Sequence, residues 1–334
     1  MKKSVLLKIA AAASAAALVL TGCERGGAEG GSAAPEENFT KDLTFGTGGT
    51  AGVYYPLGNE YARLLQDTDA DLKVNAVETD GSVDNLGRIA KGDAQLGFTQ
   101  SNTANDAVRG TGDFEEVGKL SNVGWMGQLY PEAAQIITLE KSGFDSVEDL
   151  KGKKIAVGAP GSGTAAVAKL ILDAYGFKEG DYEPYEESFA DARSKVQDGN
   201  IDASIEILGV PAAALSELSA NADVKLLPID KDKAEKIAAE SEYESYEIPG
   251  GAYDFAKDPV QTVTVFATIV GSTNQISEED GYAITKSLYE DAGKISLAQG
   301  KLIKVEDALL GRGDVPLHPG AKKYFEEKGV EDQN

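Results

Sequence analysis

Residues 43–65 read LTFGTGGTAGVYYPLGNEYARLL and combine a short apolar run, a turn of glycine and threonine, and a segment with helical spacing. The run at 43–46 predicts a strand. Segment 54–65 repeats its large apolar residues every three or four positions, which predicts a helix. The same order of strand, turn and helix returns twice before residue 109. Strands that alternate with helices predict an α/β fold with a mainly parallel sheet.

A second series of strands and helices starts near residue 130. From residue 123 onward the predicted strands are 123–129, 134–139, 154–157, 201–207, 224–227 and 263–270, and at the last of them the chain is expected to return to the first lobe. The predicted helices are 164–175, 189–197, 211–219 with a proline in its first turn, and 278–297. Two such series predict two lobes with a ligand cleft between them. The first lobe comprises residues 41–128 and 262–334, and the second comprises residues 129–261.

The first 23 residues predict export to a membrane surface. Three lysines precede an apolar run at 9–20, and Gly22 is followed by Cys23, the only cysteine of the chain. This order is typical of a bacterial lipoprotein signal peptide, 1–22, that is cut before a lipidated cysteine. The run is too short for a spanning helix, which needs ~20 apolar residues. Residues 23–40 are predicted to form a flexible tether, and the protein is predicted to be an extracytoplasmic lipoprotein, on the cell surface or in the periplasm.

The charge of the chain argues against nucleic acid as a partner. The sequence has 32 Lys and Arg, 55 Asp and Glu, and a net charge of −23. Such a surface repels phosphate backbones. His318 is the only histidine, which argues against a His-based metal site or catalytic triad. We therefore predict no metal, no cofactor and no catalytic residue.

Three turns rich in Gly, Ser and Thr each open a predicted helix, at 46–51, 79–82 and 158–164. Helix N-termini present unpaired N–H groups, and glycine lets a ligand approach them, so these turns suit a carboxylate or phosphate. The alternative is that they are ordinary helix caps. Turn 158–164 resembles a P-loop but has Thr164 in place of lysine. Turn 46–51 matches a dinucleotide fingerprint, although an exported protein meets little NAD. Ser162 lacks the flanking pattern of a hydrolase nucleophile.

Several motifs together resemble those of the TAXI solute receptors, the binding subunits of one branch of TRAP transporters. They are GTGGT at 46–50 with YYPLG at 54–58, TDGSVDNL at 79–86, LYPE at 129–132, VGAPGSGT at 157–164, GNIDA at 199–203, GVP at 209–211 and PLHPGA at 316–321. The resemblance spans residues 43–328. It implies a two-lobed type II periplasmic-binding-protein fold that closes on a small anion such as glutamate, glutamine or 2-oxoglutarate. It also implies a membrane permease with fused small and large subunits, driven by a cation gradient. The alternative function is a ligand-binding sensor or antigen that is not coupled to transport.

The resemblance also implies a set of ligand-binding residues. They are Gly49, Tyr54, Tyr55, Ser82, Gln100, Ser101, Pro160, Gly161, Ser162, Gly163 and Thr164. Glu206, on a predicted strand, is added as a partner for a ligand ammonium group, with a solvent-facing strand residue as the alternative. Asp80 stands where the family often has glycine, and this departure leaves the identity of the ligand open.

Overall fold

The computed structural model describes residues 37–68 and 70–331. Ten strands form one mixed sheet in the order β2-β1-β3-β10-β4-β7-β5-β6, with β8 on β4 and β9 on β10. The strands are β1 (Asp42–Gly46), β2 (Lys73–Val77), β3 (Leu96–Gln100), β4 (Val123–Leu139), β5 (Lys154–Ala156), β6 (Glu183–Tyr185), β7 (Ala203–Gly209), β8 (Val224–Leu227), β9 (Glu244–Ile248) and β10 (Val260–Ser272).

Helices connect most of these strands. They are α1 (Tyr54–Gln66), α2 (Ser82–Lys91), α3 (Ser101–Arg109), α4 (Gly163–Ala174), α5 (Phe189–Gln197), α6 (Ala213–Asn221), α7 (Lys231–Glu240), α8 (Glu278–Glu290) and α9 (Pro319–Lys328). Among them, α1, α2 and α4 start directly after the three turns that the sequence singled out. The glycine-rich turns and the helical spacing of the sequence therefore predicted the starts of these three helices.

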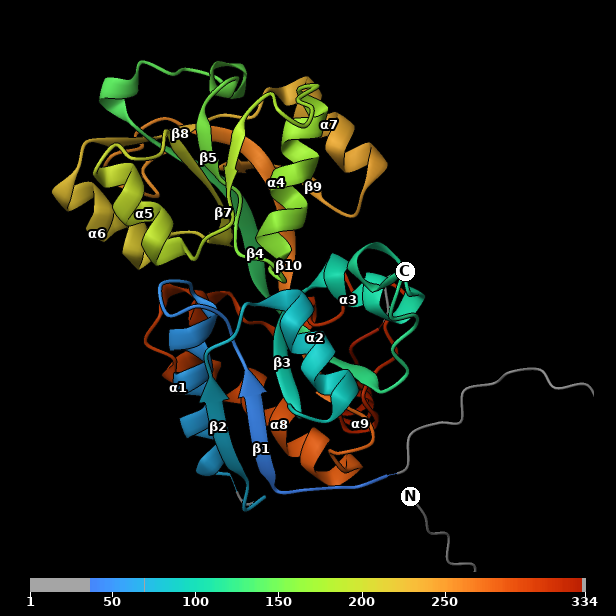
Figure 1. Ribbon diagram of the computed structural model, residues 1–334. Helices are drawn as coiled ribbons and strands as arrows, with labels where there is room; N and C mark the ends of the chain where they lie inside the picture. The colour runs from blue at the N-terminus through green and yellow to red at the C-terminus, as the bar shows by residue number, and fades with distance from the viewer. Residues whose placement is uncertain (1–36, 69, 332–334) are drawn as a thin grey trace, which may run out of the picture. The chain divides into compact units, whose positions relative to one another are not determined.

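The two long strands β4 and β10 lie side by side at the middle of the sheet (Figure 1). β10 pairs antiparallel with β9 through its first residues and with β3 through its later ones. β4 pairs with β10 and then, from Glu132 onward, with β7. Around this centre, β1–β2, β1–β3, β5–β6 and β5–β7 are parallel pairs. Each half of the sheet is thus parallel, and two antiparallel strands join them.

Apolar side chains pack into two clusters, one larger than the other. The larger contains Phe45, Leu57 and Phe98 from the elements around β1 and β3. The smaller contains Ile155 and Ile205 from the elements around β5 and β7. Burial of each such side chain stabilises the fold by ~1.5–3 kcal/mol. The exact boundaries of the two predicted lobes, 41–128 with 262–334 and 129–261, stay a prediction.

Four differences from the sequence prediction concern prolines, helix ends and missed elements. The two strands predicted at 123–129 and 134–139 are one strand, β4. Pro131 is tolerated because β7 pairs with β4 only from Glu132 onward, so the proline faces a strand on one side only. α6 starts at Ala213, after Pro211 rather than around it. α8 ends at Glu290, where Asp291 leaves the helical conformation. The prediction missed β6, α7, β9 and α9.

The predicted signal peptide, Cys23 and most of the tether lie outside the described residues. The first contacts with the folded part are backbone hydrogen bonds from Asn38 to Asn274 and from Thr40 to Gln275. In the described part of the chain, no helix combines the length and the apolar character needed to cross a bilayer.

Candidate functional site

A cavity of about 70 Å³ lies where the three glycine-rich turns converge. The turns contribute Gly48, Gly49, Gly52 and Val53, then Asp80, Gly81 and Ser82, and then Ser162, Gly163 and Thr164. Tyr54, Gln100, Glu132, Phe189, Ile207 and Leu208 complete the wall. A single water needs ~10–15 Å³ of such space, so the cavity has room for several waters or one compact solute.

Seven of the twelve predicted ligand-binding residues line this cavity. They are Gly49, Tyr54, Ser82, Gln100, Ser162, Gly163 and Thr164. Their role as ligand contacts stays a prediction, but the fold brings together residues more than 100 positions apart in the sequence.

The other five predicted residues lie elsewhere. Tyr55, Pro160, Gly161 and Glu206 do not line the cavity, and Ser101 lines a different cavity beside Gly311. The Gly161 carbonyl accepts hydrogen bonds from the backbone N–H groups of Val83 (3.1 Å) and Asp84 (3.3 Å), in the first turn of α2. The chain itself therefore occupies part of the α2 N-terminus, which leaves the start of α4 as the more open donor group.

The start of α4 is built by a tight turn. Ser162 is the N-cap, and its side chain accepts a hydrogen bond from the Ala165 N–H at 3.3 Å. Gly158 and Gly161 have φ of +90° and +81°, a region that favours glycine. At Gly163, a Cβ atom would lie 2.2 Å from Oε1 of Gln100. Glycine at 163 therefore allows the Gln100 side chain to contact the first turn of this helix.

Sequence reasoning missed several residues of the wall, such as Phe189, Ile207 and Leu208, and the buried acid among them is Glu132. Its side chain is 2 % exposed, at the point where β4 meets both β10 and β7. Tyr54 donates a hydrogen bond from its hydroxyl to Oε2 of Glu132 at 3.1 Å, and Gln100 donates one from Nε2 at 3.3 Å. Burial raises the pKa of the Glu132 carboxyl to about 8, although these two hydrogen bonds lower it. An acid inside the apolar run 129–139 is the signal in the sequence that marks this position.

Glu206 is also buried, with 0 % exposure, but it has a partner within the chain. Arg193 donates to both carboxylate oxygens of Glu206, with 3.1 Å between Nε and Oε1. Burial raises the pKa of Glu206, and the Arg193 charge opposes this rise. Nη1 of Arg193 also donates to the Ala51 carbonyl at 2.9 Å. Glu206 thus holds an arginine that supports the first turn, and the structure does not place its carboxylate in the cavity wall.

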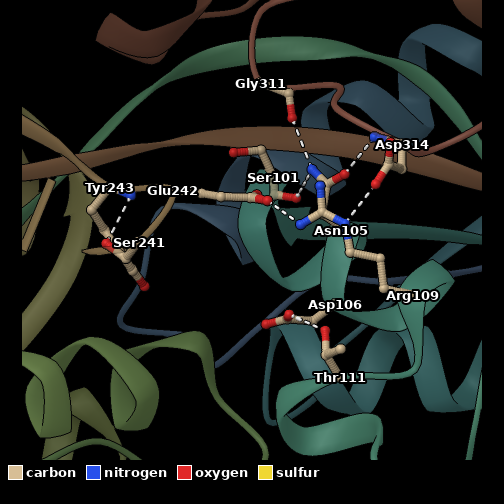
Figure 2. A network of polar contacts seen from close by, with 10 residues as sticks. All are labelled: Ser101, Asn105, Asp106, Arg109, Thr111, Ser241, Glu242, Tyr243, Gly311 and Asp314. Carbon is tan, nitrogen blue, oxygen red and sulfur yellow. Dashed lines mark hydrogen bonds and ion pairs between the residues drawn. The ribbon is translucent and has the colours of Figure 1, made fainter. Parts of the chain in front are cut away.

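The basic side chains near the turns form ion pairs with acids outside the cavity wall. Arg88 pairs with Asp84 at 2.9 Å, as the i,i+4 spacing predicts, and Lys169 pairs with Asp173. Arg109 lies between Glu242 and Asp314, in a network that also contains Asn105 (Figure 2). Among the described residues that form the cavity wall, none is Lys, Arg or His. An anion bound there would depend on N–H and hydroxyl donors.

The described residues offer no obvious place for a metal. Within residues 37–68 and 70–331, no group of three His, Cys, Asp or Glu side chains could hold a metal ion. His318 is buried, accepts a hydrogen bond from the Gly320 N–H at 3.2 Å, and caps α9. Burial lowers the pKa of His318 to about 4, so its ring is neutral at pH 7. This histidine has a structural role at a helix start.

Comparison with known proteins assigns the chain to a family. The model of the NMT1-like family matches residues 45–329. The chain belongs to the NMT1-like family. The match covers both series of strands and helices and all three glycine-rich turns of this NMT1-like chain.

Solved structures confirm the fold class. The alkanesulfonate-binding protein SsuA from Xanthomonas axonopodis pv. citri, bound to MOPS, is 17 % identical with a TM-score of 0.50, and the match covers 86 % of this chain and 84 % of that one. A protein from Bordetella bronchiseptica RB50 is 18 % identical with a TM-score of 0.51, and the match covers 86 % and 82 %. At these identities the likeness concerns the fold alone. The predicted α/β fold of the periplasmic solute-binding type is thereby confirmed for this NMT1-like chain.

Proposed function

We propose that this protein is a solute receptor that captures one small carboxylate in the cavity at the starts of α1, α2 and α4. The observation that carries the proposal is the convergence of these three helix starts, with Ser82, Ser162 and Thr164, on one cavity. The Ser162 hydroxyl donates to the Ala159 carbonyl at 2.6 Å, so Ser162 shapes the turn that presents the N–H groups of α4. The family assignment and the fold support it, because the similar structure with a stated ligand is a binding protein. We assign the chain no catalytic step.

The start of α4 is the proposed anion partner. The N–H groups of a first helical turn have no partner inside the helix, and the helix dipole adds about half a positive charge there. Gly163 and Thr164 are the first residues of α4, and both line the cavity. A charge-assisted hydrogen bond contributes ~1.5–3 kcal/mol, so a few such donors bind a carboxylate without an arginine.

The negative charge of the chain does not prevent this binding. The net charge of −23 acts at long range. At physiological salt, charges are screened over ~8 Å, whereas the proposed donors act at contact distance. Capture therefore depends on the local donors rather than on electrostatic steering.

The transport step is proposed from the motifs that resemble TAXI receptors. In this proposal, lipidated Cys23 and residues 24–40 tether the receptor near a TRAP-type permease, which takes up the solute with a cation gradient. Uptake by cells that contain both proteins would then stop when the cation gradient is collapsed and continue when ATP is depleted. The reverse pattern would exclude a TRAP partner and leave the receptor function standing.

A thermal-shift screen tests the receptor function. We expect small carboxylic acids to raise the melting temperature, because a ligand that binds only the folded state stabilises it. In the Ser162→Ala/Thr164→Ala double variant this shift should largely disappear. Ser277→Ala is the matched control, because Ser277 caps α8 in the same way, with its side chain accepting from Asp280, and does not line the cavity. A screen without any stabilising carboxylate, or an equal shift in the double variant, would refute the proposal.

A further inference from the structure

One wall of the cavity carries hydrogen-bond acceptors that have no donor in the described part of the chain. Both donors near Glu132, the Tyr54 hydroxyl and the Gln100 amide nitrogen, point to its Oε2 atom. Within residues 37–68 and 70–331, no hydrogen bond reaches Oε1 of Glu132. Oε1 of Gln100 is a buried atom without a hydrogen-bond partner, and Gln100 is 3 % exposed. A buried acceptor without a donor is costly, so a ligand that donates to the Gln100 oxygen would complete this site, and Glu132 in its ionised form would add Oε1 as a second acceptor.

A charged donor fits these acceptors better than a neutral one. The described residues of the wall include the acids Asp80 and Glu132 and no basic residue. A second carboxylate on a ligand would therefore find no positively charged partner in this wall. An ammonium group carries three N–H donors and a positive charge, which matches one carboxylate and one amide oxygen.

The acceptors also adjoin the proposed anion site. Oε1 of Gln100 lies so close to the first residue of α4 that a Cβ at Gly163 would be 2.2 Å away. Donors for a carboxylate and acceptors for an ammonium group are thus neighbours. In an α-amino acid, the carboxylate and the ammonium group are attached to the same carbon, so their partners have to be neighbours as well.

We infer that Glu132 and Gln100 recognise the ammonium group of the solute, so that the receptor selects compact neutral α-amino acids over the corresponding 2-oxo acids and over dicarboxylates. This inference rests on the proposed function, since it takes the start of α4 as the carboxylate site. Cavity size supports a compact side chain, because the space is about 70 Å³.

The binding of an amino acid should then be coupled to the release of a proton from Glu132. In the protein without solute, burial raises the pKa of Glu132 to about 8, so the carboxyl is mostly protonated at pH 7. The ionisable neighbours are Tyr54, Tyr130 and Tyr243, whose pKa values are all raised, and Asp80 in the wall. The tyrosines stay protonated at pH 7, so Glu132 is the group that an arriving ammonium ion would ionise. An amino acid should therefore release up to one proton when it binds, and an oxo acid should not.

Isothermal titration calorimetry with matched ligand pairs tests the inference. The probes are glycine, L-alanine, L-serine and L-glutamine, each beside the 2-oxo acid with the same carbon skeleton, with ethylamine as an amine that lacks a carboxylate. We expect at least one amino acid to bind about tenfold or more tightly than its oxo acid, with proton release seen as a heat that depends on the buffer. Ethylamine should bind weakly.

The Glu132→Gln variant isolates the charge, because it keeps the size of the side chain and its acceptor oxygen. We expect its affinity for the amino acid to fall about tenfold or more, with the proton release abolished and the oxo-acid affinity unchanged or higher. Glu78→Gln is the control, since Glu78 is an acid near the first turn that does not line the cavity. Its affinity should match that of the wild type.

The outcomes separate this inference from the proposed function. Equal or tighter binding of the oxo acid in every pair, or unchanged amino-acid affinity in Glu132→Gln, would overturn the ammonium site and leave a carboxylate receptor. If none of the amino acids or oxo acids binds and the thermal-shift screen finds no stabilising carboxylate, the proposed function itself fails.

Discussion

Two buried glutamates on neighbouring strands, Glu132 of β4 and Glu206 of β7, have opposite surroundings. Glu206 receives both hydrogen bonds of the Arg193 fork and one from Ser204 at 3.2 Å. Glu132 receives two hydrogen bonds from neutral groups and faces the cavity. The chain itself supplies a counter-charge to the first carboxylate and none to the second. A buried acid that is fully paired supports the fold, and one that lacks a counter-charge at a cavity marks a place for a ligand.

The largest loss of stability is expected when Arg193, the partner of Glu206, is replaced. Arg193→Ala removes the counter-charge of a fully buried carboxylate, so we expect a loss of ~3–5 kcal/mol in the free energy of unfolding. Urea denaturation at pH 7 measures it. In Lys169→Ala, which breaks an exposed pair with Asp173, the loss should stay below about 0.5 kcal/mol. Similar small losses in both variants would show that the buried pair does not support the fold.

The pH dependence of stability tests Glu132. Between about pH 5 and 7 the unfolded chain has lost the Glu132 proton, while the folded protein keeps it because its pKa is raised to about 8. Raising the pH therefore favours the unfolded state, by up to ~1.4 kcal/mol per pH unit and so about 3 kcal/mol over this range. The Glu132→Gln variant lacks this titration.

We accordingly expect Glu132→Gln to gain stability relative to the wild type as the pH rises from 5 to 7. Urea denaturation at both pH values, without ligand, measures the difference between the two proteins. Parallel pH profiles for wild type and variant would mean that Glu132 is ionised in the folded protein at pH 5.

A smaller effect is expected at Tyr54, which donates to Glu132. Tyr54→Phe removes one hydrogen bond to a buried acceptor and should cost ~1 kcal/mol of stability at pH 7. Tyr55→Phe is the neighbouring control, because in the described part of the chain the Tyr55 hydroxyl has no hydrogen bond. Chemical denaturation of the two variants side by side measures the difference, and equal stabilities would remove Tyr54 as a partner of Glu132.

The smallest effect is expected when both members of the buried pair are replaced. Arg193→Met with Glu206→Leu leaves no unpaired charge, so the stability should lie within about 1 kcal/mol of that of the wild type. The comparison with Arg193→Ala alone separates the cost of an unpaired charge from the value of the pair. A double variant as unstable as the single one would point to the Ala51 contact of Arg193 as the feature that matters.

The glycine-rich turns show what the sequence made predictable. Turns 46–51, 79–82 and 158–164 each follow a strand and open a helix, and the parallel pairing of β1 with β2 and β3 brings the first two to one edge of the sheet. Local patterns were sufficient for this part, because turn chemistry and helical spacing act over short stretches of chain. The position of turn 158–164 beside α2 depends on contacts between residues more than 75 positions apart in the sequence, such as the hydrogen bond between Gly161 and Val83.

The two glutamates show what the sequence left open. Each lies in an apolar run, so the pattern alone marks both as candidates for a buried charge. The partner of Glu206 is Arg193, on α5, and the partners of Glu132 are Tyr54 and Gln100, on other elements again. Which acid is paired is decided by tertiary contacts. The sequence therefore favoured Glu206 as a ligand contact, whereas the structure places Glu132 in the cavity wall.

Native mass spectrometry tests the central claim most directly. The protein is incubated with an equimolar mixture of the four amino acids, their 2-oxo acids and small dicarboxylates, and the bound molecule is identified after collisional release. We predict one amino acid per chain in the wild type and in Ser277→Ala, and a much lower occupancy by the amino acid in Glu132→Gln and in Ser162→Ala/Thr164→Ala. Wild-type occupancy by the amino acid in both of these variants, or a wild-type protein that binds an oxo acid or nothing, would contradict the account.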